Sequence, residues 1–469
     1  MDNREYRTIF IVITRGFIIR NILRSGTLKY LLDAGFRVIV FLDTDSKQQI
    51  PQYLKKEFED GKVFLEKISS SSVYMKGYSR FTRLTPMLVS IKSRWMHIQI
   101  GNDRNKRRAF FWKYIELFFF SIVSKFHFLK TWARYAERTI FSHNEYAKYF
   151  EKYKPVLVFA TSIQARPDID IMKEAQKRSI STVSMSKGWD NITQLLYRVV
   201  PDILIVQNER MKKEASRVQR IPLNKIHVTG FPQFDWYRKP EIIVSREEFC
   251  KWYDMDPNKK IIFFGSEGGW APDDEGIIEL LVQWVNTRSA LSRDSQLIVR
   301  PHFTDVKSGR LLKFNKIGNT VVDDNITLSD FFGDNWDPGV GEIKKFTNLI
   351  FHCDVLVTVA STLTLDCVCF DKPLVNVAFG ALHNPRNGKD TTPLLYTQDH
   401  YSWVLETNAV DVANSEKELL ESINMYLLNP SRKKREREQL LQKLCYKVDG
   451  RSSERIANIL IKTANRERY

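Results

Sequence analysis

Cysteine is scarce in this sequence, and no apolar run is long enough to cross a membrane. The 469 residues include five cysteines and no CxxC pair, which argues against a disulfide framework or a cysteine zinc site and favours a reducing compartment. The most apolar stretch, 110–123, contains Lys113 and Glu116 and is shorter than the ~20 apolar residues that span a bilayer. The run 8–13 is too short for a signal peptide and predicts a buried strand. What remains is a folded globular chain, with 43% hydrophobic and 27% charged residues.

Acidic residues are too few to balance the basic ones. The formal net charge is +17, and residues 76–138 hold fourteen Lys or Arg against three Asp or Glu, a local net charge of +11. Such a field favours an anionic partner, which can be a lipid headgroup, a phosphorylated substrate or a nucleic acid. Segment 110–123 within it is either a buried helix of a first domain or a membrane-surface helix with basic flanks. The basic cluster 432–435 is either a solvated helix face or a second membrane contact.

Two successive sets of alternating strands and helices predict the fold class. In the first half, apolar runs typical of strands buried on both faces occur at 8–13, 37–42, 156–160, 182–186 and 203–206. In the second half they recur at 261–264, 296–300, 320–322, 355–359 and 373–378. Residues 232–244 contain two prolines and no clear period, which indicates a boundary. The sequence therefore predicts an α/β protein with two Rossmann-like, doubly wound domains. Their predicted limits are 1–238, with a basic and aromatic helical insertion at 76–138, then 239–450, followed by a C-terminal helix at 451–469.

Ligands of such folds bind at the carboxyl ends of the strands, and the loop after strand 355–359 is the clearest candidate. The strand ends in Ser361 and Thr362, which open a helix, and Asp366 follows one turn later. Free backbone N–H groups and the helix dipole would bind a diphosphate there, and Asp366 would accept hydrogen bonds from ribose hydroxyls. The alternative is ordinary helix capping by Ser361 or Thr362.

Two more loops of the second half carry polar residues at strand ends. The strand at 296–300 delivers Arg300 and then His302, which suit phosphate pairing and proton transfer. Loop 265–269 contains three glycines, which allow a close approach of the backbone to an anion. It lacks the lysine of a P-loop, so its specificity is low. A structural histidine and a flexible turn are the alternatives at these two places.

A fourth loop, Lys187 to Asn191, follows a strand of the first half. Trp189 offers a stacking face, Lys187 a positive charge, and Asp190 a carboxylate. An N-cap at Asp190 or Asn191 is the alternative. DxD strings occur at 43–45, 168–170 and 254–256. A metal-bound diphosphate could use such a pair, but chance matches are expected among 55 acidic residues, and we predict no metal.

Several of these motifs are similar to those of a known group of enzymes. Residues 221–235, IPLNKIHVTGFPQFD, resemble the interdomain signature of bacterial GT-B transferases of surface carbohydrates. Similar motifs occur in glycerophosphotransferases that use CDP-glycerol and in UDP-N-acetylglucosamine 2-epimerases. The string 187–191 is similar to one in surface-polysaccharide members of that group. Residues 449–455 resemble the start of their C-terminal helix, which crosses back onto the first domain.

The resemblance implies a GT-B architecture, in which the second domain binds a nucleotide-activated donor and the first binds an acceptor across a cleft. It implies a glycosyltransferase that moves a sugar from a nucleotide-sugar onto a surface polysaccharide, a lipopolysaccharide or another lipid-linked glycan, without a metal or other cofactor. The loop 360–362 departs from the glycines of the epimerases and from the consecutive serines of the glycerophosphotransferases, and these departures favour sugar transfer. A CDP-glycerol-type glycerophosphotransferase is the alternative.

A second alternative is a nucleic-acid-binding protein, but the sequence contains no recognisable nucleic-acid module, and we expect no such partner. We expect a cytoplasmic enzyme, peripheral on the inner face of the cytoplasmic membrane, whose basic first domain meets an anionic surface.

The predicted mechanism follows from these residues. The helix start at 361–362 and Arg300 would stabilise charge that develops on the diphosphate. Asp190 is the first candidate for the base that activates the acceptor hydroxyl, and Asp168 is the second. We expect Arg300→Ala or Asp366→Ala to abolish donor binding and to leave the fold intact. The predicted site comprises the donor residues Gly265, Ser266, Glu267, Arg300, His302, Ser361, Thr362 and Asp366, the catalytic candidates Asp190, Asp168 and His302, and the cleft residues Arg15, Gly16, Lys187, Trp189 and Asn191.

Overall fold

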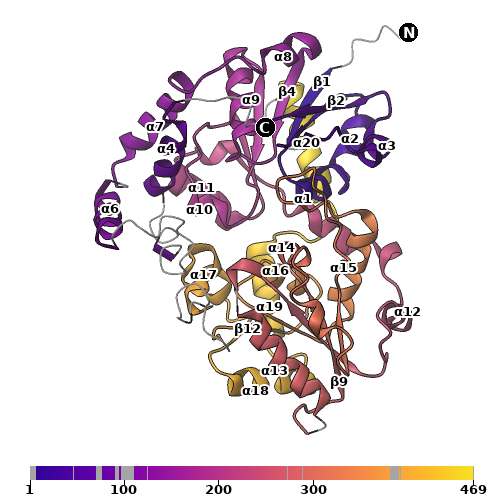
Figure 1. The fold of residues 1–469 in the computed structure, drawn as a ribbon. Coiled ribbons are helices and arrows are strands. Elements are labelled where there is room, and N and C mark those ends of the chain that lie inside the picture. Colours follow the sequence, from indigo (N-terminus) through magenta and orange to yellow (C-terminus); the bar gives the residue numbers. More distant parts are fainter. Residues whose placement is uncertain are drawn as a thin grey trace.

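Two parallel β-sheets, each covered by helices, form the two lobes of the molecule (Figure 1). The structure is a computed structural model, and it describes residues 7–467 except 46, 70–75, 90–94, 97–109, 124, 272, 288, 381–389 and 391. The first sheet has seven strands in the order β3-β2-β1-β4-β5-β6-β7, and the second has six in the order β10-β9-β8-β11-β12-β13. The predicted α/β class with two doubly wound sheets is confirmed.

The strand bounds agree closely with the apolar runs of the sequence. The first sheet comprises β1 (Thr8–Ile13), β2 (Arg37–Asp43), β3 (Val63–Ile68), β4 (Pro155–Ala160), β5 (Ser181–Met185), β6 (Ile203–Val206) and β7 (Ile226–Val228). The second comprises β8 (Lys260–Gly265), β9 (Ser295–Arg300), β10 (Thr320–Val322), β11 (Val355–Thr358), β12 (Leu374–Val377) and β13 (Asp411–Ala413). Every residue of β1 and of β9 is buried, as expected of central strands covered on both faces.

Helices connect the parallel strands and cover both sheets. Those before β8 are α1 (Gly16–Ile18), α2 (Thr27–Asp33), α3 (Gln52–Phe58), α4 (Tyr78–Leu84), α6 (Phe110–Val123), α7 (His127–Thr139), α8 (Ala147–Tyr153), α9 (Arg166–Lys177), α10 (Asn191–Gln194), α11 (Glu209–Gln219) and α12 (Arg246–Lys251). Those after β8 are α13 (Asp274–Asn286), α14 (Phe303–Val306), α15 (Val340–His352), α16 (Leu363–Val368), α17 (Asp399–Leu405), α18 (Glu416–Leu428), α19 (Lys434–Leu440) and α20 (Ser452–Ala464).

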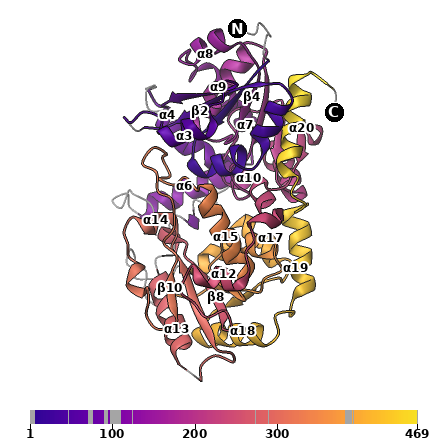
Figure 2. The ribbon, with the colours of Figure 1, turned by 90° about the vertical axis from the view of Figure 1, so that its right-hand side faces the viewer.

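The last helix returns to the first lobe. Figure 2 shows α19 beside the second lobe and α20 beside the first, along the same edge of the molecule. Ile456 and Leu460 of α20 are fully buried in the core that contains β1. The Asp235 carboxylate accepts hydrogen bonds from the backbone N–H groups of Ser452 and Ser453, at 2.9 and 2.7 Å, and so caps the helix start. The crossing predicted for this helix is confirmed. We retain the predicted domain limits as a proposal.

A segment of the second lobe also reaches the first. Residues 324–339, here called the strap, connect β10 to α15, and Phe331 and Phe332 of the strap are buried in the core of the first lobe. Asp337 of the strap accepts a hydrogen bond from the Tyr53 hydroxyl at 2.6 Å and forms an ion pair with Arg24 at 2.5 Å. The two lobes are therefore joined by buried apolar and charged contacts at the strap as well as by α20.

The basic insertion projects from the first lobe as helices α6 and α7 (Figure 1). Part of it lies outside the described residues. Phe118, Phe119 and Ile122 of α6 are exposed to 70, 58 and 46%, so the expectation of a buried helix at 110–123 is wrong for the part whose side chains are described. The membrane-surface alternative remains a prediction. No helix in the described part of the chain combines the length and the apolar character that a membrane crossing needs.

Candidate functional site

A cavity of about 330 Å³, here called the main cavity, lies between the two lobes. Both sheets reverse their strand order nearby, between β1 and β4 and between β8 and β11, which is where open α/β sheets bind ligands. The first lobe contributes Phe17, Arg20, Gln233, Trp236 and Tyr237. All eight predicted donor residues line this one cavity, namely Gly265, Ser266, Glu267, Arg300, His302, Ser361, Thr362 and Asp366.

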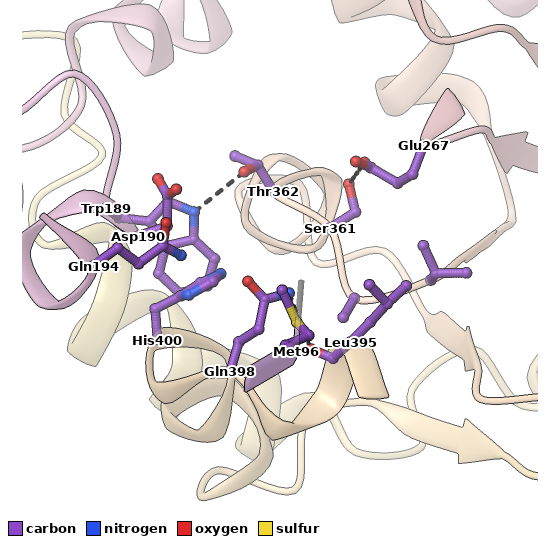
Figure 3. Close-up of a pocket in the computed structure, with 12 residues that line it drawn as sticks. Met96, Trp189, Asp190, Gln194, Glu267, Ser361, Thr362, Leu395, Gln398 and His400 are labelled. Atoms are coloured by element: carbon purple, nitrogen blue, oxygen red, sulfur yellow. Dashed lines mark hydrogen bonds between the residues drawn. The ribbon is translucent and has the colours of Figure 1, made fainter. Parts of the chain in front are cut away.

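The Ser361–Thr362 turn faces the first lobe. The Trp189 indole N–H donates a hydrogen bond to the Thr362 hydroxyl across the cleft at 3.2 Å (Figure 3). The Ser361 hydroxyl accepts from the backbone N–H of Leu363 at 3.1 Å and donates to the Glu267 carboxylate. The Ser361 contact belongs to the turn before α16, whereas Thr362 occupies the N-cap position and makes no side-chain capping hydrogen bond. Because α16 is only six residues long, its dipole is small, and side-chain charges matter more than expected.

Arg300 lines the cavity but is already neutralised. Its guanidinium forms ion pairs with Asp323 and, at 2.9 Å, with Glu342. The two carboxylates raise the Arg300 pKa despite its burial. Breaking a buried pair of this kind leaves an uncompensated charge, so the expectation that Arg300→Ala would spare the fold is contradicted by its environment. The structure favours a structural task for this residue over phosphate pairing.

Sequence reasoning missed Arg20, which enters the same cavity from the first lobe. Arg20 lies on the π-helical turn Ile19–Leu23, which precedes Gly26, a residue with a φ of +124° at the start of α2. Its guanidinium lies over the Trp336 ring at 5.4 Å and donates to the Asn21 carboxamide at 2.9 Å. Among the described residues, no carboxylate forms an ion pair with it. Burial lowers its pKa, and the nearby Asp366 and Glu342 partly offset this. A half-buried cation that faces a cavity and forms no ion pair suits an anionic ligand.

Two carboxyl groups line the same cavity, that of Asp366, which is buried, and that of Glu267, which is half-buried. Burial raises the Asp366 pKa to about 6, although the Tyr237 hydroxyl donates a hydrogen bond to it at 2.5 Å. Burial likewise raises the Glu267 pKa to about 7. His302 caps the start of α14 with its Nδ1 facing the Thr304 hydroxyl at 2.7 Å, and burial lowers its pKa, so the imidazole is neutral at pH 7. The cavity thus offers hydrogen-bond acceptors beside one unpaired cation.

A family comparison decides what kind of protein this cavity belongs to. The family described as CDP-glycerol:poly(glycerophosphate) glycerophosphotransferase matches residues 172–462, which is more than half of the chain. The chain belongs to this glycerophosphotransferase family. The resemblance to this group is therefore confirmed, and so is the coarse expectation of a transferase.

Solved structures agree on the fold of this glycerophosphotransferase family member. The wall teichoic acid polymerase TagF is 10% identical, with a TM-score of 0.52, 98% of this chain covered and 90% of that chain. MnaA of S. aureus, solved with UDP, is 11% identical, with a TM-score of 0.53 and coverage of 98 and 97%. A putative UDP-N-acetylglucosamine 2-epimerase from Listeria monocytogenes has 11% identity, a TM-score of 0.53 and coverage of 99 and 98%. These likenesses establish the GT-B-like fold alone. No curated protein matches the chain.

The other predicted site residues of this glycerophosphotransferase family member lie at three different locations. A second cavity, of about 210 Å³ and here called the basic chamber, contains Lys187, Trp189, Asp190 and also Arg20. Burial lowers the Lys187 pKa. Asn191 lies behind it, and its carboxamide oxygen accepts from the Gly188 N–H at 3.2 Å.

Arg15 and Gly16 meet the strap rather than a cavity. The Gly16 N–H donates to the Asp334 carboxylate at 3.0 Å. Burial raises the Asp334 pKa, and the nearby positive charge of Arg15 partly offsets this. A Cβ added to Gly16 would lie 1.7 Å from the Trp336 carbonyl oxygen, so only glycine fits this close approach. These two residues therefore hold the lobes together.

Asp168 cannot serve as the second candidate base in this structure. Its side chain is fully buried, accepts from the Ser162 N–H at 2.9 Å, and lines neither the main cavity nor the basic chamber. It lies in the first turn of α9, and burial raises its pKa well above the ordinary value. No group of three or more His, Cys, Asp or Glu in the described part of the chain could hold a metal ion.

Proposed function

We propose that the protein transfers a phosphoglycerol-type group from a CDP-linked donor, bound in the main cavity, to a hydroxyl of a surface-polymer acceptor. Family membership supports this alternative over the sugar transfer that the loop 360–362 favoured. The observation that carries the proposal is the main cavity itself, where one arginine without a carboxylate partner among the described residues faces the eight predicted donor residues between two lobes. Arg20 and the Thr362 turn would then neutralise the diphosphate without a metal.

The transfer replaces one bond to phosphorus by another. The acceptor hydroxyl oxygen forms a bond to the phosphorus that carries glycerol, and the bond from this phosphorus to the oxygen of CMP breaks. The hydroxyl proton passes to a base, for which Asp190 remains our candidate because it lines a chamber that adjoins Thr362. Arg20 stabilises the charge that develops on the departing CMP oxygen. His302, neutral at pH 7, lines the same cavity as a hydrogen-bond partner for phosphate.

Donor choice is tested by product analysis. The purified protein is incubated with CDP-glycerol, or with UDP- or GDP-sugars, and with a glycerophosphate oligomer as acceptor. We expect CMP release, together with a mass increase of one glycerophosphate unit on the acceptor, only with CDP-glycerol. Release of UDP or GDP with a hexose added to the acceptor would support sugar transfer and contradict the proposal.

We also propose that the insertion contacts an anionic membrane surface where the acceptor is held. Phe128, Trp132 and Tyr135 of α7 are exposed to 66, 58 and 64% and, at spacings of four and three, form one aromatic stripe on the helix. On the opposite face of α7, Lys130 and Arg134 donate to backbone carbonyls of the first lobe and so fix the helix on it, and burial lowers the pKa of each. An exposed aromatic stripe on an insertion whose net charge is +11 suits the interface of an anionic bilayer.

Vesicle sedimentation tests the membrane contact. We expect the protein to sediment with vesicles that contain phosphatidylglycerol and to stay in solution with phosphatidylcholine alone. Replacing the three rings of the aromatic stripe by serine should abolish sedimentation. Tyr30→Ser, which removes an exposed ring on α2, is the matched control and should have no effect. Equal binding of the stripe variant, or binding to RNA in place of vesicles, would contradict this part of the proposal.

A further inference from the structure

A third cavity, here called the side chamber, opens on the other side of the Ser361–Thr362 turn. It has a volume of about 210 Å³ and shares Glu267, Ser361 and Thr362 with the main cavity. Its other polar side chains come from both lobes, with Trp189, Asp190 and Gln194 from the first and Gln398 and His400 from the second (Figure 3). A ligand in the side chamber would therefore meet a ligand in the main cavity at this turn.

The charges of the side chamber differ from those of its neighbours. Among its described lining residues there is no lysine or arginine, whereas the basic chamber contains Lys187 and Arg20. The side chamber instead offers the carboxyl groups of Asp190 and Glu267. An anionic ligand would face these carboxyl groups without a compensating cation, which is unfavourable away from bulk water. Ligand hydroxyls can donate to carboxylates and can exchange hydrogen bonds with carboxamides.

His400 adds an independent sign that a ligand belongs here. Only 7% of its surface is exposed, and its Nδ1 is buried without a hydrogen-bond partner among the described residues. Its ring packs edge to face against Trp189, with ring centroids 4.7 Å apart, so it lies at the junction of the lobes (Figure 3). Buried polar groups usually have partners, and a ligand with several hydroxyls would supply one for this nitrogen.

We propose that the side chamber binds an uncharged, hydroxyl-rich unit, a polyol or sugar ring, at the end of the acceptor. Asp190, Gln194, Gln398 and His400 hold its hydroxyls, and the reacting hydroxyl points to the Ser361–Thr362 turn. This inference rests on the proposed function, because it assigns the acceptor that meets the donor there. It specifies an acceptor end without phosphate, because no lysine or arginine among the described lining residues could pair with a phosphate group.

Saturation-transfer NMR on the full chain in the presence of CDP tests this assignment with three probes. We expect signal transfer to glycerol and to methyl β-glucoside, and none to sn-glycerol 3-phosphate. In the double variant Gln194→Leu and Gln398→Leu, transfer to the neutral probes should fall at least fivefold. Gln194→Trp, which fills the chamber from a half-buried position, should give the same loss. Gln283→Leu, at an exposed position of α13 outside these cavities, is the matched control and should retain it.

The outcomes separate the two proposals. Three results would overturn the side-chamber assignment. The first is no signal transfer from the wild type to the neutral probes, and the second is unchanged transfer in both chamber variants. The third is equal transfer to glycerol 3-phosphate. Calorimetric titration with CDP reports on the proposed function by itself, and intact CDP affinity in the chamber variants shows that they are folded. If CDP does not bind the wild type, the donor proposal fails, whatever the probes show.

Discussion

The two walls of the main cavity carry their charges differently. The wall from the second lobe contains Arg300, but this guanidinium is balanced by Asp323 and Glu342, and the same wall adds the carboxyl groups of Glu267 and Asp366. The wall from the first lobe contributes Arg20, which has no carboxylate partner among the described residues. The lobe that holds most of the predicted donor residues therefore does not supply the free positive charge.

The difference shows that the ion-pair partners of an arginine distinguish a structural charge from one that can bind a ligand. Both arginines line the main cavity, Arg300 buried and Arg20 half-buried, yet only Arg20 forms no ion pair with a described residue. Because Arg20 comes from the opposite lobe, phosphate binding depends on the two lobes staying together. The strap keeps them together through Phe331, Phe332 and Asp337.

The largest expected effect is a difference in the free energy of unfolding between variants of the two arginines. Arg300→Met leaves Asp323 and Glu342 buried and unpaired, so we expect a loss of about 3–5 kcal/mol in the free energy of unfolding. Arg20→Met removes a half-buried charge that forms no ion pair with a described carboxylate and acts on Asp366 only from a distance, so we expect its stability to stay within about 1 kcal/mol of wild type. Urea denaturation of both variants measures this. Equal losses would show that the distinction between the walls is false.

Asp366→Asn should stabilise the protein and weaken donor binding. Burial raises the folded-state pKa of Asp366 to about 6 from 3.8, so its stability contribution is complete below pH 3.8 and is lost as the pH rises through 6. At pH 7 the asparagine avoids this cost, which at about 1.4 kcal/mol per pKa unit is up to about 3 kcal/mol. Thermal unfolding between pH 4 and 8 should show the gain growing with pH. A variant less stable than wild type at pH 7 would contradict this interpretation.

Gly16→Val should separate the walls by displacing the strap. The added side chain meets the Trp336 carbonyl oxygen, and we expect a cost of about 1–3 kcal/mol together with weaker CDP-glycerol binding, because Arg20 and Trp336 move apart. Gly341→Ala is the matched control, since an added Cβ there meets nothing within 4 Å. Small-angle scattering and calorimetry should show a change for Gly16→Val alone. Unchanged scattering and affinity would show that the strap does not position Arg20.

The smallest expected effect concerns the hydrogen bond across the cleft. Thr362→Val removes the acceptor of the Trp189 indole N–H and should cost about 0.5–1.5 kcal/mol. The indole fluorescence should also shift, because Trp189 loses its partner at the turn. Thr364→Val, which removes a buried hydroxyl beside Tyr401 within the second lobe, is the comparison and should leave the Trp189 signal unchanged. The same spectral shift in both variants would contradict the cross-lobe role of Thr362.

Strand ends were the part of the site that the sequence could reveal. Arg300, Ser361 and Glu267 each end or follow an apolar run, and the carboxyl ends of parallel strands meet at one edge, so their convergence is a consequence of topology. The same argument applies to Asp323, which follows β10, the neighbour of the strand that ends in Arg300. Glu342 could not be found in this way, because it lies on α15, 42 positions from Arg300, and no strand end precedes it.

Local sequence patterns also could not predict which elements cross between the lobes. Phe331 and Phe332 lie in a segment without strand or helix periodicity, so their burial in the other lobe depends on the tertiary arrangement alone. Arg20 was hidden at the edge of a stretch that has helical spacing, because a π-helical turn changes which face each residue occupies. Asp168 illustrates the reverse error, since a sequence does not show that this side chain is buried in the first lobe, where it accepts a hydrogen bond from the Ser162 N–H.

The most direct test of the central claim is calorimetric titration of CDP-glycerol into wild-type protein and Arg20→Gln. If the free charge of the first lobe binds the donor diphosphate, the wild type binds CDP-glycerol and the variant binds it on the order of 10- to 100-fold more weakly, which corresponds to about 1.4–2.8 kcal/mol. Equal affinities of the two proteins, or no binding by the wild type, would contradict the account.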